Sequence, residues 1–255
     1  MEKNIILAGV GGQGILSIAF VIDHAAMDAG FNFKQAEVHG MAQRGGAVQS
    51  NLRYGDGEIW SDIIPTGKAD LVLSVEPLEA LRYQHFLRPD GWVVTSTTPF
   101  INIPDYPESD PLLDQLAGVE NIVMVDTAHF ARAAGNRRAQ NMVTVGAASP
   151  LLDFDEERLL VFVEKLFARK GEKIVAVNQR AFRFGRAAGL FFRGLTENAM
   201  DKRFALRLVR KLDPETIDAV HAGAWAEAIQ NDSARLEALL AEEGAVPCER
   251  IPAFA

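Results

Sequence analysis

The sequence predicts an α/β fold with a mostly parallel sheet, flanking helices and a C-terminal helical extension. Short apolar runs rich in branched residues, of which residues 4–10 are the first, alternate with longer segments in which apolar residues recur every three or four positions. The first run ends in glycines and leads directly into a helical pattern, as a buried parallel strand passes into its crossover helix. After residue 194 only polar helical patterns follow.

The predicted strands are short and mostly apolar, as expected of a sheet that is buried on both faces. They cover residues 4–10, 31–38, 47–54, 70–75, 91–95 and 122–125. In residues 47–54 apolar and polar side chains alternate, which predicts one exposed face. A brief strand at 58–61 is expected to complete a hairpin with it.

The predicted helices have one apolar side, and residues 154–168 begin with acids and end with bases, the order that the helix dipole favours. They cover residues 15–30, 77–86, 127–134, 141–148, 154–168 and 172–192. Residues 97–111 contain four prolines and are expected to form an irregular loop. We therefore divide the chain into a Rossmann-like α/β domain, residues 1–193, and a helical extension, residues 194–255.

Composition restricts the class of protein and its partners. Of the 255 residues, 48% are apolar and 24% are charged, which is typical of a globular protein. Lys and Arg total 26 against 34 Asp and Glu, a formal net charge of −8, which argues against a nucleic-acid-binding protein. The sequence shows no apolar run long enough to span a membrane and no secretory signal pattern, so we expect a cytoplasmic protein.

Cysteine usage restricts the chemistry further. The single cysteine is Cys248. One thiol excludes an internal disulfide framework, a zinc site built from several cysteines and a self-contained iron–sulfur cluster, which needs about four thiolates. If the protein takes part in redox chemistry, its electron carrier is expected on another chain.

A glycine-rich turn is the strongest local motif. Gly9, Gly11 and Gly14 fit the G-x-G-x-x-G spacing between a strand and a helix, where glycines permit a tight turn and the helix N-terminus attracts an anion. The only acid placed to bind a ribose, Glu37, lies in a polar run, which argues against a nicotinamide cofactor. Three alternatives stay open: a dinucleotide, another phosphate-bearing ligand, or a tight turn that binds either nothing or a protein partner.

A second loop bracketed by glycines joins two of the predicted strands. It carries His39, Gln43 and Arg44 before Gly45 and Gly46. In a parallel sheet this loop lies at the carboxyl edge beside the first glycine turn, where Arg44 can bind a phosphate or a carboxylate. The alternative is that Arg44 and His39 only fasten the loop or contact another chain. Because the sequence has no nucleophile elbow, P-loop lysine or histidine cluster, the chain alone is not expected to be catalytic.

Three segments together resemble one protein family. They are residues 9–15 (GVGGQGI), residues 36–46 (AEVHGMAQRGG), and residues 61–64 (SDII) with 69–80 (ADLVLSVEPLEA). They are similar to the gamma-type subunits of 2-oxoacid:ferredoxin oxidoreductases. The HGMAQRGG string favours the indolepyruvate branch over the pyruvate and 2-oxoglutarate branches. The resemblance covers about residues 1–193.

The resemblance implies a subunit of an enzyme that decarboxylates a 2-oxoacid oxidatively, forms an acyl-CoA and passes electrons to ferredoxin. Thiamine diphosphate and iron–sulfur clusters are expected on a larger alpha subunit, which agrees with the single cysteine of this chain. The chain is expected to bind no metal, to hold no cofactor alone, and to help bind CoA or shield the active site. The residues expected at its cofactor-binding site are Gly9, Gly11, Gly12, Gln13, Gly14, His39, Gln43, Arg44, Gly45 and Gly46.

Two alternatives to an indolepyruvate enzyme stay open. The same type of complex can act on another 2-oxoacid, such as pyruvate, a branched-chain acid or 2-oxoglutarate, because the substrate pocket is expected mainly in the partner subunit. The alternative from a different class is a stand-alone nucleotide-binding module, which requires tight binding of NAD(H) or CoA by this chain alone. Without its partner, exposed apolar surface is expected to favour a homodimer.

Overall fold

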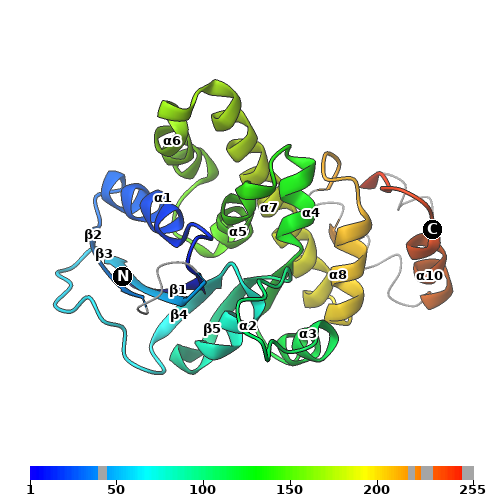
Figure 1. Cartoon of the computed structure of the whole chain (residues 1–255), viewed down its shortest axis with the longest axis horizontal. Coiled ribbons are helices and arrows are strands. Elements are labelled where there is room, and N and C mark those ends of the chain that lie inside the picture. Colours follow the sequence, from blue (N-terminus) through cyan, green and yellow to red (C-terminus); the bar gives the residue numbers. More distant parts are fainter. Residues whose placement is uncertain (40–44, 218–221, 225–231, 249–255) are drawn as a thin grey trace.

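The fold is built on one six-stranded sheet. A computed structural model describes residues 1–39, 45–217, 222–224 and 232–248 (Figure 1). The strands are β1 (Glu2–Val10), β2 (Asn32–His39), β3 (Ala47–Gly55), β4 (Ala69–Ser74), β5 (Leu87–Ser96) and β6 (Ile122–Val125). Their order across the sheet is β2-β3-β1-β4-β5-β6, and β1, β4, β5 and β6 run parallel. The prediction of a mostly parallel α/β sheet is confirmed.

The antiparallel part of the sheet is the β2–β3 hairpin. β3 pairs with both β2 and β1, so the hairpin inserts it between the first two strands of the fold. Neighbouring strands lie about 4.8 Å apart, which places β2 about 10 Å from β1. In a dinucleotide-binding sheet the second strand is adjacent to the first. This difference in strand order counts against the dinucleotide alternative.

The prediction of a brief strand at 58–61 is wrong, because these residues form an irregular loop. Arg53 on β3 explains the difference. Its guanidinium donates hydrogen bonds to the backbone oxygens of Ser61 at 2.7 Å and of Ile63 at 3.3 Å. Carbonyl groups that a strand would use in a ladder therefore accept hydrogen bonds from a side chain instead.

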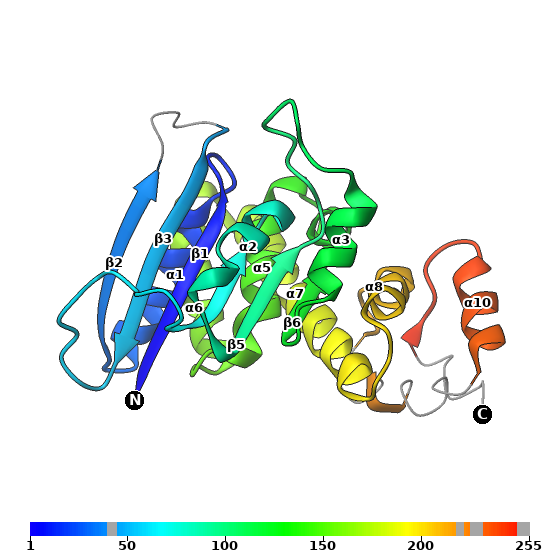
Figure 2. The same cartoon turned by 90° about the horizontal axis from the view of Figure 1, so that it is seen from below.

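Helices cover both faces of the sheet (Figure 2). They are α1 (Ile15–Asp28), α2 (Pro77–Arg82), α3 (Ser109–Ala117), α4 (Thr127–Ala133), α5 (Gln140–Ala148), α6 (Glu156–Phe167), α7 (Glu172–Glu197), α8 (Lys202–Lys211) and α10 (Ser233–Ala241). α1, α5 and α7 pack on one face, and α2 packs on the other over β1, β4 and β5. In the part of the chain that the structure describes, no helix is long and apolar enough to cross a lipid bilayer.

Two differences in helix boundaries bear on the predicted loop and on the predicted domain division. α3 begins at Ser109, inside the segment 97–111 for which the prolines predict an irregular loop, because Pro111 lies in its first turn, where the missing N–H of proline is not needed. α7 continues past residue 192 to Glu197. The predicted boundary between residues 193 and 194 therefore falls inside a continuous helix. The division into a domain and an extension stays a prediction.

The start of the predicted extension is attached to the α/β body through α8. The ammonium group of Lys202 donates to the carbonyl oxygens of Ala117 at 3.2 Å and Glu120 at 3.1 Å, just before β6. Arg203 forms ion pairs with Asp110 at 2.8 Å and Asp114 at 2.5 Å, both on α3. These contacts hold α8 beside α3, near the edge strand β6.

Asp23 places a carboxyl group among the buried residues of α1. The residue is 4% exposed, and its Oδ1 has no hydrogen-bond partner among the described residues. Burial raises the pKa of Asp23 from 3.8 to about 7, so the folded state favours the protonated form. The free energy of unfolding is therefore expected to fall as the pH rises from about 4 to above 7, because charging the carboxyl costs more in the folded than in the unfolded state.

The substitution Asp23→Asn is expected to remove this pH dependence. Between about pH 5 and pH 8 the variant should gain roughly 2–3 kcal/mol of stability relative to the wild type, since an amide does not ionise. Urea denaturation of both proteins at the two pH values measures the difference. Parallel pH profiles for the two proteins would show that Asp23 does not titrate as its burial implies.

Candidate functional site

The glycine turn between β1 and α1 has a backbone conformation that requires glycine. Gly12 and Gly14 have φ angles of 104° and 82°, in the left-handed region that strains any residue with a Cβ. Gly9 is required for a different reason, since a Cβ there would lie 2.5 Å from Val75 Cγ2. The motif recognised in the sequence is therefore a tight strand-to-helix turn.

Gln13 fastens this turn to the sheet. Its Oε1 accepts a hydrogen bond from the Val10 N–H at 2.8 Å, and its Nε2 donates to the Val75 carbonyl oxygen at 3.4 Å. Both ends of the side-chain amide are thus engaged by backbone groups of β1 and of the segment after β4. Gln13 acts in this structure as a positioning residue, and its predicted contact with a cofactor stays a prediction.

The first turn of α1 presents backbone amides at the carboxyl end of β1. Gly14 caps the helix without a side-chain hydrogen bond, and the first turn holds no acidic residue. No described residue accepts a hydrogen bond from the amides of Gly12, Gly14, Ile15 or Leu16. Together with the positive end of the helix dipole, these N–H groups can bind an anion such as a phosphate.

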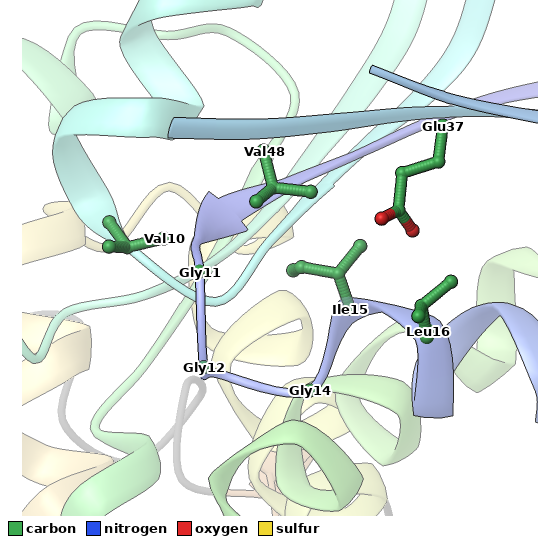
Figure 3. A pocket seen from close by; sticks show the side chains of 8 residues that line it. All are labelled: Val10, Gly11, Gly12, Gly14, Ile15, Leu16, Glu37 and Val48. Carbon is green, nitrogen blue, oxygen red and sulfur yellow. The ribbon is translucent and has the colours of Figure 1, made fainter. Parts of the chain in front are cut away.

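An open pocket of about 430 Å³ lies between this turn and the hairpin (Figure 3). It is lined by Val10, Gly11, Gly12, Gly14, Ile15, Leu16, Glu37 and Val48. The half-buried Glu37 points from β2 toward the first turn of α1 (Figure 3). The pocket therefore combines apolar walls with the amides of the turn and one carboxylate.

The second glycine loop lies beside the first, as the sequence predicts. The Gly11 N–H donates to the Gly46 carbonyl at 2.8 Å, and the Gly45 N–H donates to the Gly11 carbonyl at 3.2 Å. Asn102 also donates to the Gly45 carbonyl, at 2.9 Å. The backbone of His39 pairs with β3. The His39 side chain, Gln43 and Arg44 lie outside the described residues, so their predicted roles stay predictions.

Three residues that the sequence motifs do not include belong to the same region. Asn141, at the start of α5, donates from Nδ2 to the Gly14 carbonyl at 3.4 Å, and the residue is 7% exposed. A Cβ on Gly14 would lie 2.6 Å from that nitrogen. Arg137 and Arg138 are exposed on the turn just before α5 and form no salt bridge with the described residues. An asparagine at the start of a small apolar helix was the only available signal.

Glu76, just after β4, holds loop 97–108 in place at the carboxyl edge of the sheet. This carboxylate is 1% exposed and accepts hydrogen bonds from the Glu79 N–H at 2.8 Å and the Phe100 N–H at 3.3 Å. It also accepts one from the Tyr106 hydroxyl. Burial and the neighbouring Glu76 carboxylate raise the pKa of Tyr106, so the phenol stays protonated and keeps donating. Loop 97–108 is thereby tied to the carboxyl end of β4.

The groups at the carboxyl edge of the sheet are suited to binding a ligand. Among the described residues, no group of three or more His, Cys, Asp or Glu side chains is arranged to hold a metal ion. The groups that converge on the pocket are backbone amides, apolar side chains and Glu37. The backbone amides suit recognition of a phosphate group, and the Glu37 carboxylate suits a hydrogen-bond donor on the ligand instead of the phosphate itself.

Residues 4–188 match the protein family described as pyruvate ferredoxin/flavodoxin oxidoreductase. The chain belongs to this family. It is 36% identical over 204 residues to indolepyruvate oxidoreductase subunit IorB of Thermococcus kodakarensis, which covers 76% of this chain and 99% of that protein. It is 41% identical over 153 residues to the subunit of the same name in Archaeoglobus fulgidus, covering 57% of this chain and 75% of that protein. The family inferred from the sequence motifs is confirmed.

Solved structures support the fold. The 2-oxoglutarate:ferredoxin oxidoreductase of Magnetococcus marinus superposes with a TM-score of 0.59 at 22% identity, covering 74% of this chain and 31% of that one. Pyruvate oxidoreductase subunit PORC of Thermotoga maritima gives 0.57 at 21% identity, covering 72% of this chain and 95% of that one. Because the family match ends at residue 188, α8 and α10 lie beyond it.

Proposed function

We propose that this chain is the small subunit of an indolepyruvate:ferredoxin oxidoreductase, a complex that converts arylpyruvates to acyl-CoA products and passes the electrons to ferredoxin. One observation carries the proposal: proteins named indolepyruvate oxidoreductase subunit IorB match at 36–37% identity over 94–99% of their own length and 72–76% of this chain. Relatives named for 2-oxoglutarate and ketoisovalerate match at only 26–27% identity. A complex of the same type that acts on another 2-oxoacid is the alternative.

The redox centres of this complex belong to a larger alpha subunit in the proposal. A single cysteine cannot supply the thiolates of an iron–sulfur cluster. The clusters are therefore assigned to the partner. Thiamine diphosphate is assigned to the partner because the family resemblance implies it, and ferredoxin is proposed to receive electrons from that partner. We place the complex in the cytoplasm. The role left for this chain is to bind and orient, at the carboxyl edge of its sheet.

The ligand proposed for this edge is CoA, held through its phosphates. The amides of the glycine turn and the positive end of α1 fit a phosphate group. Arg137 and Arg138 follow one another just before Asn141, which contacts Gly14, and Arg44 lies in the neighbouring loop by sequence. Guanidinium groups bind phosphate oxygens in a bidentate manner. The chemistry of the edge thus suits a polyanionic cofactor.

The same edge exposes apolar side chains that suit contact with the partner. Phe100, Ile101 and Ile103 are 41%, 75% and 39% exposed on loop 97–108, and Leu16 is 61% exposed at the start of α1. Exposed apolar side chains of this kind are typical of a surface that is covered in an assembly. We propose that it packs near the cofactor region of the partner and excludes water from the bound CoA.

The double substitution Arg137→Gln and Arg138→Gln is expected to raise the KM for CoA about 100-fold, because each lost hydrogen bond to a phosphate removes about 1.5 kcal/mol, which is roughly tenfold in affinity. The kcat at saturating CoA should change little, since glutamine preserves the polar surface. Arg88→Gln, at the opposite end of the sheet, is the matched control. An unchanged KM for CoA in the double variant would contradict the assignment.

A further inference from the structure

Residues 56–66 form a loop, the Trp60 loop, at the end of the sheet opposite the glycine turn. It follows Gly55, which pairs with Glu2 at the start of β1, and Asp56 forms an ion pair with the N-terminal amine at 2.6 Å. A strand of nine residues spans about 30 Å, so the whole length of β1 separates this loop from the glycine turn. The loop contains the SDII segment, to which the proposed function gives no role.

The backbone of the Trp60 loop is held firmly against the sheet. Arg53 donates to the carbonyl oxygens of Ser61 and Ile63, and its guanidinium is itself fixed by Asn4 Oδ1 at 2.7 Å. The Ile64 N–H donates to the buried Asn51 side chain at 3.1 Å. The side chain of Ile64 is fully buried, and that of Ile59, near the start of the loop, is also buried.

Trp60 lies between these two buried isoleucines in the sequence and is 83% exposed, and Ile63, three residues further along the chain, is 49% exposed. Figure 2 shows the loop crossing β2 and β3 on the side away from α1. Because the backbone is fixed on both sides, the outward position of Trp60 is imposed by the fold. A fixed backbone reduces the conformational entropy that the loop loses when a partner covers it, and tryptophan is among the residues enriched in binding hot spots.

We propose that Trp60 and Ile63 insert into an apolar pocket of the larger partner subunit and that basic side chains surround this pocket. The negative charge of the loop supports the proposal that basic side chains surround the partner's pocket. Glu58 and Asp62 flank Trp60, both are exposed, and neither forms a salt bridge with the described residues. Opposite charges at the rim of an interface guide association and fix its register. This inference rests on the proposed function, because it requires that a partner subunit exists.

The test compares the binding of the purified large subunit to the full-length wild-type chain and to its variants. Trp60→Ala is expected to weaken the affinity about 30-fold or more, as loss of a hot-spot side chain does. The pair Glu58→Lys and Asp62→Lys should also weaken binding, and added salt should weaken the wild-type interaction. Met27→Ala removes another exposed apolar side chain, from α1, and should bind as the wild type does. The urea midpoint of each variant confirms that it is folded.

Wild-type affinity in both loop variants would overturn this inference and leave the proposed function intact. A wild-type chain that binds no large subunit would overturn both. If Trp60→Ala instead converts a dimer of this chain into monomers without weakening partner binding, the loop serves contact between copies, and the inference is also overturned.

Discussion

Replacing Gly146 or Gly185 by alanine is expected to destabilise the fold severely. The two glycines lie where α5 and α7 cross. A Cβ on Gly146 would lie 1.9 Å from the Phe182 carbonyl oxygen, and one on Gly185 would lie 2.0 Å from the Val143 carbonyl oxygen. Backbone atoms cannot move aside as a side chain can, so the helices would have to separate. We expect a loss of about 3 kcal/mol or more for each variant, a large share of a typical stability of roughly 5–15 kcal/mol.

Two matched alanine variants make this prediction specific. Gly189 lies on the same helix as Gly185, but its Cβ would come only to 2.9 Å of the Ala147 carbonyl, so a smaller loss is expected. A Cβ on Gly57 would meet no atom within 4 Å, and Gly57→Ala should be nearly neutral. The measurement is the urea midpoint of the purified chains, with the yield of folded protein as a second readout. Similar midpoints for Gly146→Ala and Gly57→Ala would show that the helices are not packed as closely as described.

Gly14→Ala is expected to have the largest effect on CoA-dependent turnover. Alanine is strained at a φ of 82°, and its Cβ would lie 2.6 Å from Asn141 Nδ2, which contacts the Gly14 carbonyl. The turn and α5 must therefore shift relative to each other. Displacing binding groups by about 1 Å can lower activity about 100-fold, whereas the stability should fall by only about 1–3 kcal/mol.

The variant Gly12→Ala separates the effect of backbone strain in the turn from the effect of displacing Asn141. Gly12 has a φ of 104°, but a Cβ there would meet no atom within 4 Å. This variant should share the strain of Gly14→Ala and leave Asn141 in place, so a smaller loss of kcat/KM for CoA is expected. Both variants are assayed in the assembled complex. Wild-type kcat/KM for CoA in Gly14→Ala would mean that the turn does not position the cofactor.

Local patterns in the sequence were sufficient to predict the elements that build the edge. The apolar run at the start predicted β1, in which Ile5, Ile6 and Leu7 are fully buried, and the glycines predicted the turn that follows. The neighbouring positions of Gly45 and Gly11 followed from the rule that loops meet at the carboxyl edge of a parallel sheet.

Features that depend on distant contacts were not predictable in this way. The insertion of β3 between β1 and β2 is a matter of pairing, which a single strand's pattern does not determine. The absence of a strand at 58–61 depends on Arg53, whose long side chain replaces a ladder. Asn141 reaches Gly14 across 127 positions of sequence, so only the folded structure reveals it as part of the site.

The most direct test of the account is capture of a tagged copy of this chain from its own host, grown without oxygen, followed by assay of the captured material. We predict an iron–sulfur complex with a larger subunit that reduces a dye with indolepyruvate only when CoA is present, and more slowly with pyruvate or 2-oxoglutarate. A colourless chain without a partner that binds NAD(H) or CoA tightly by itself would contradict the account and favour a stand-alone nucleotide-binding module.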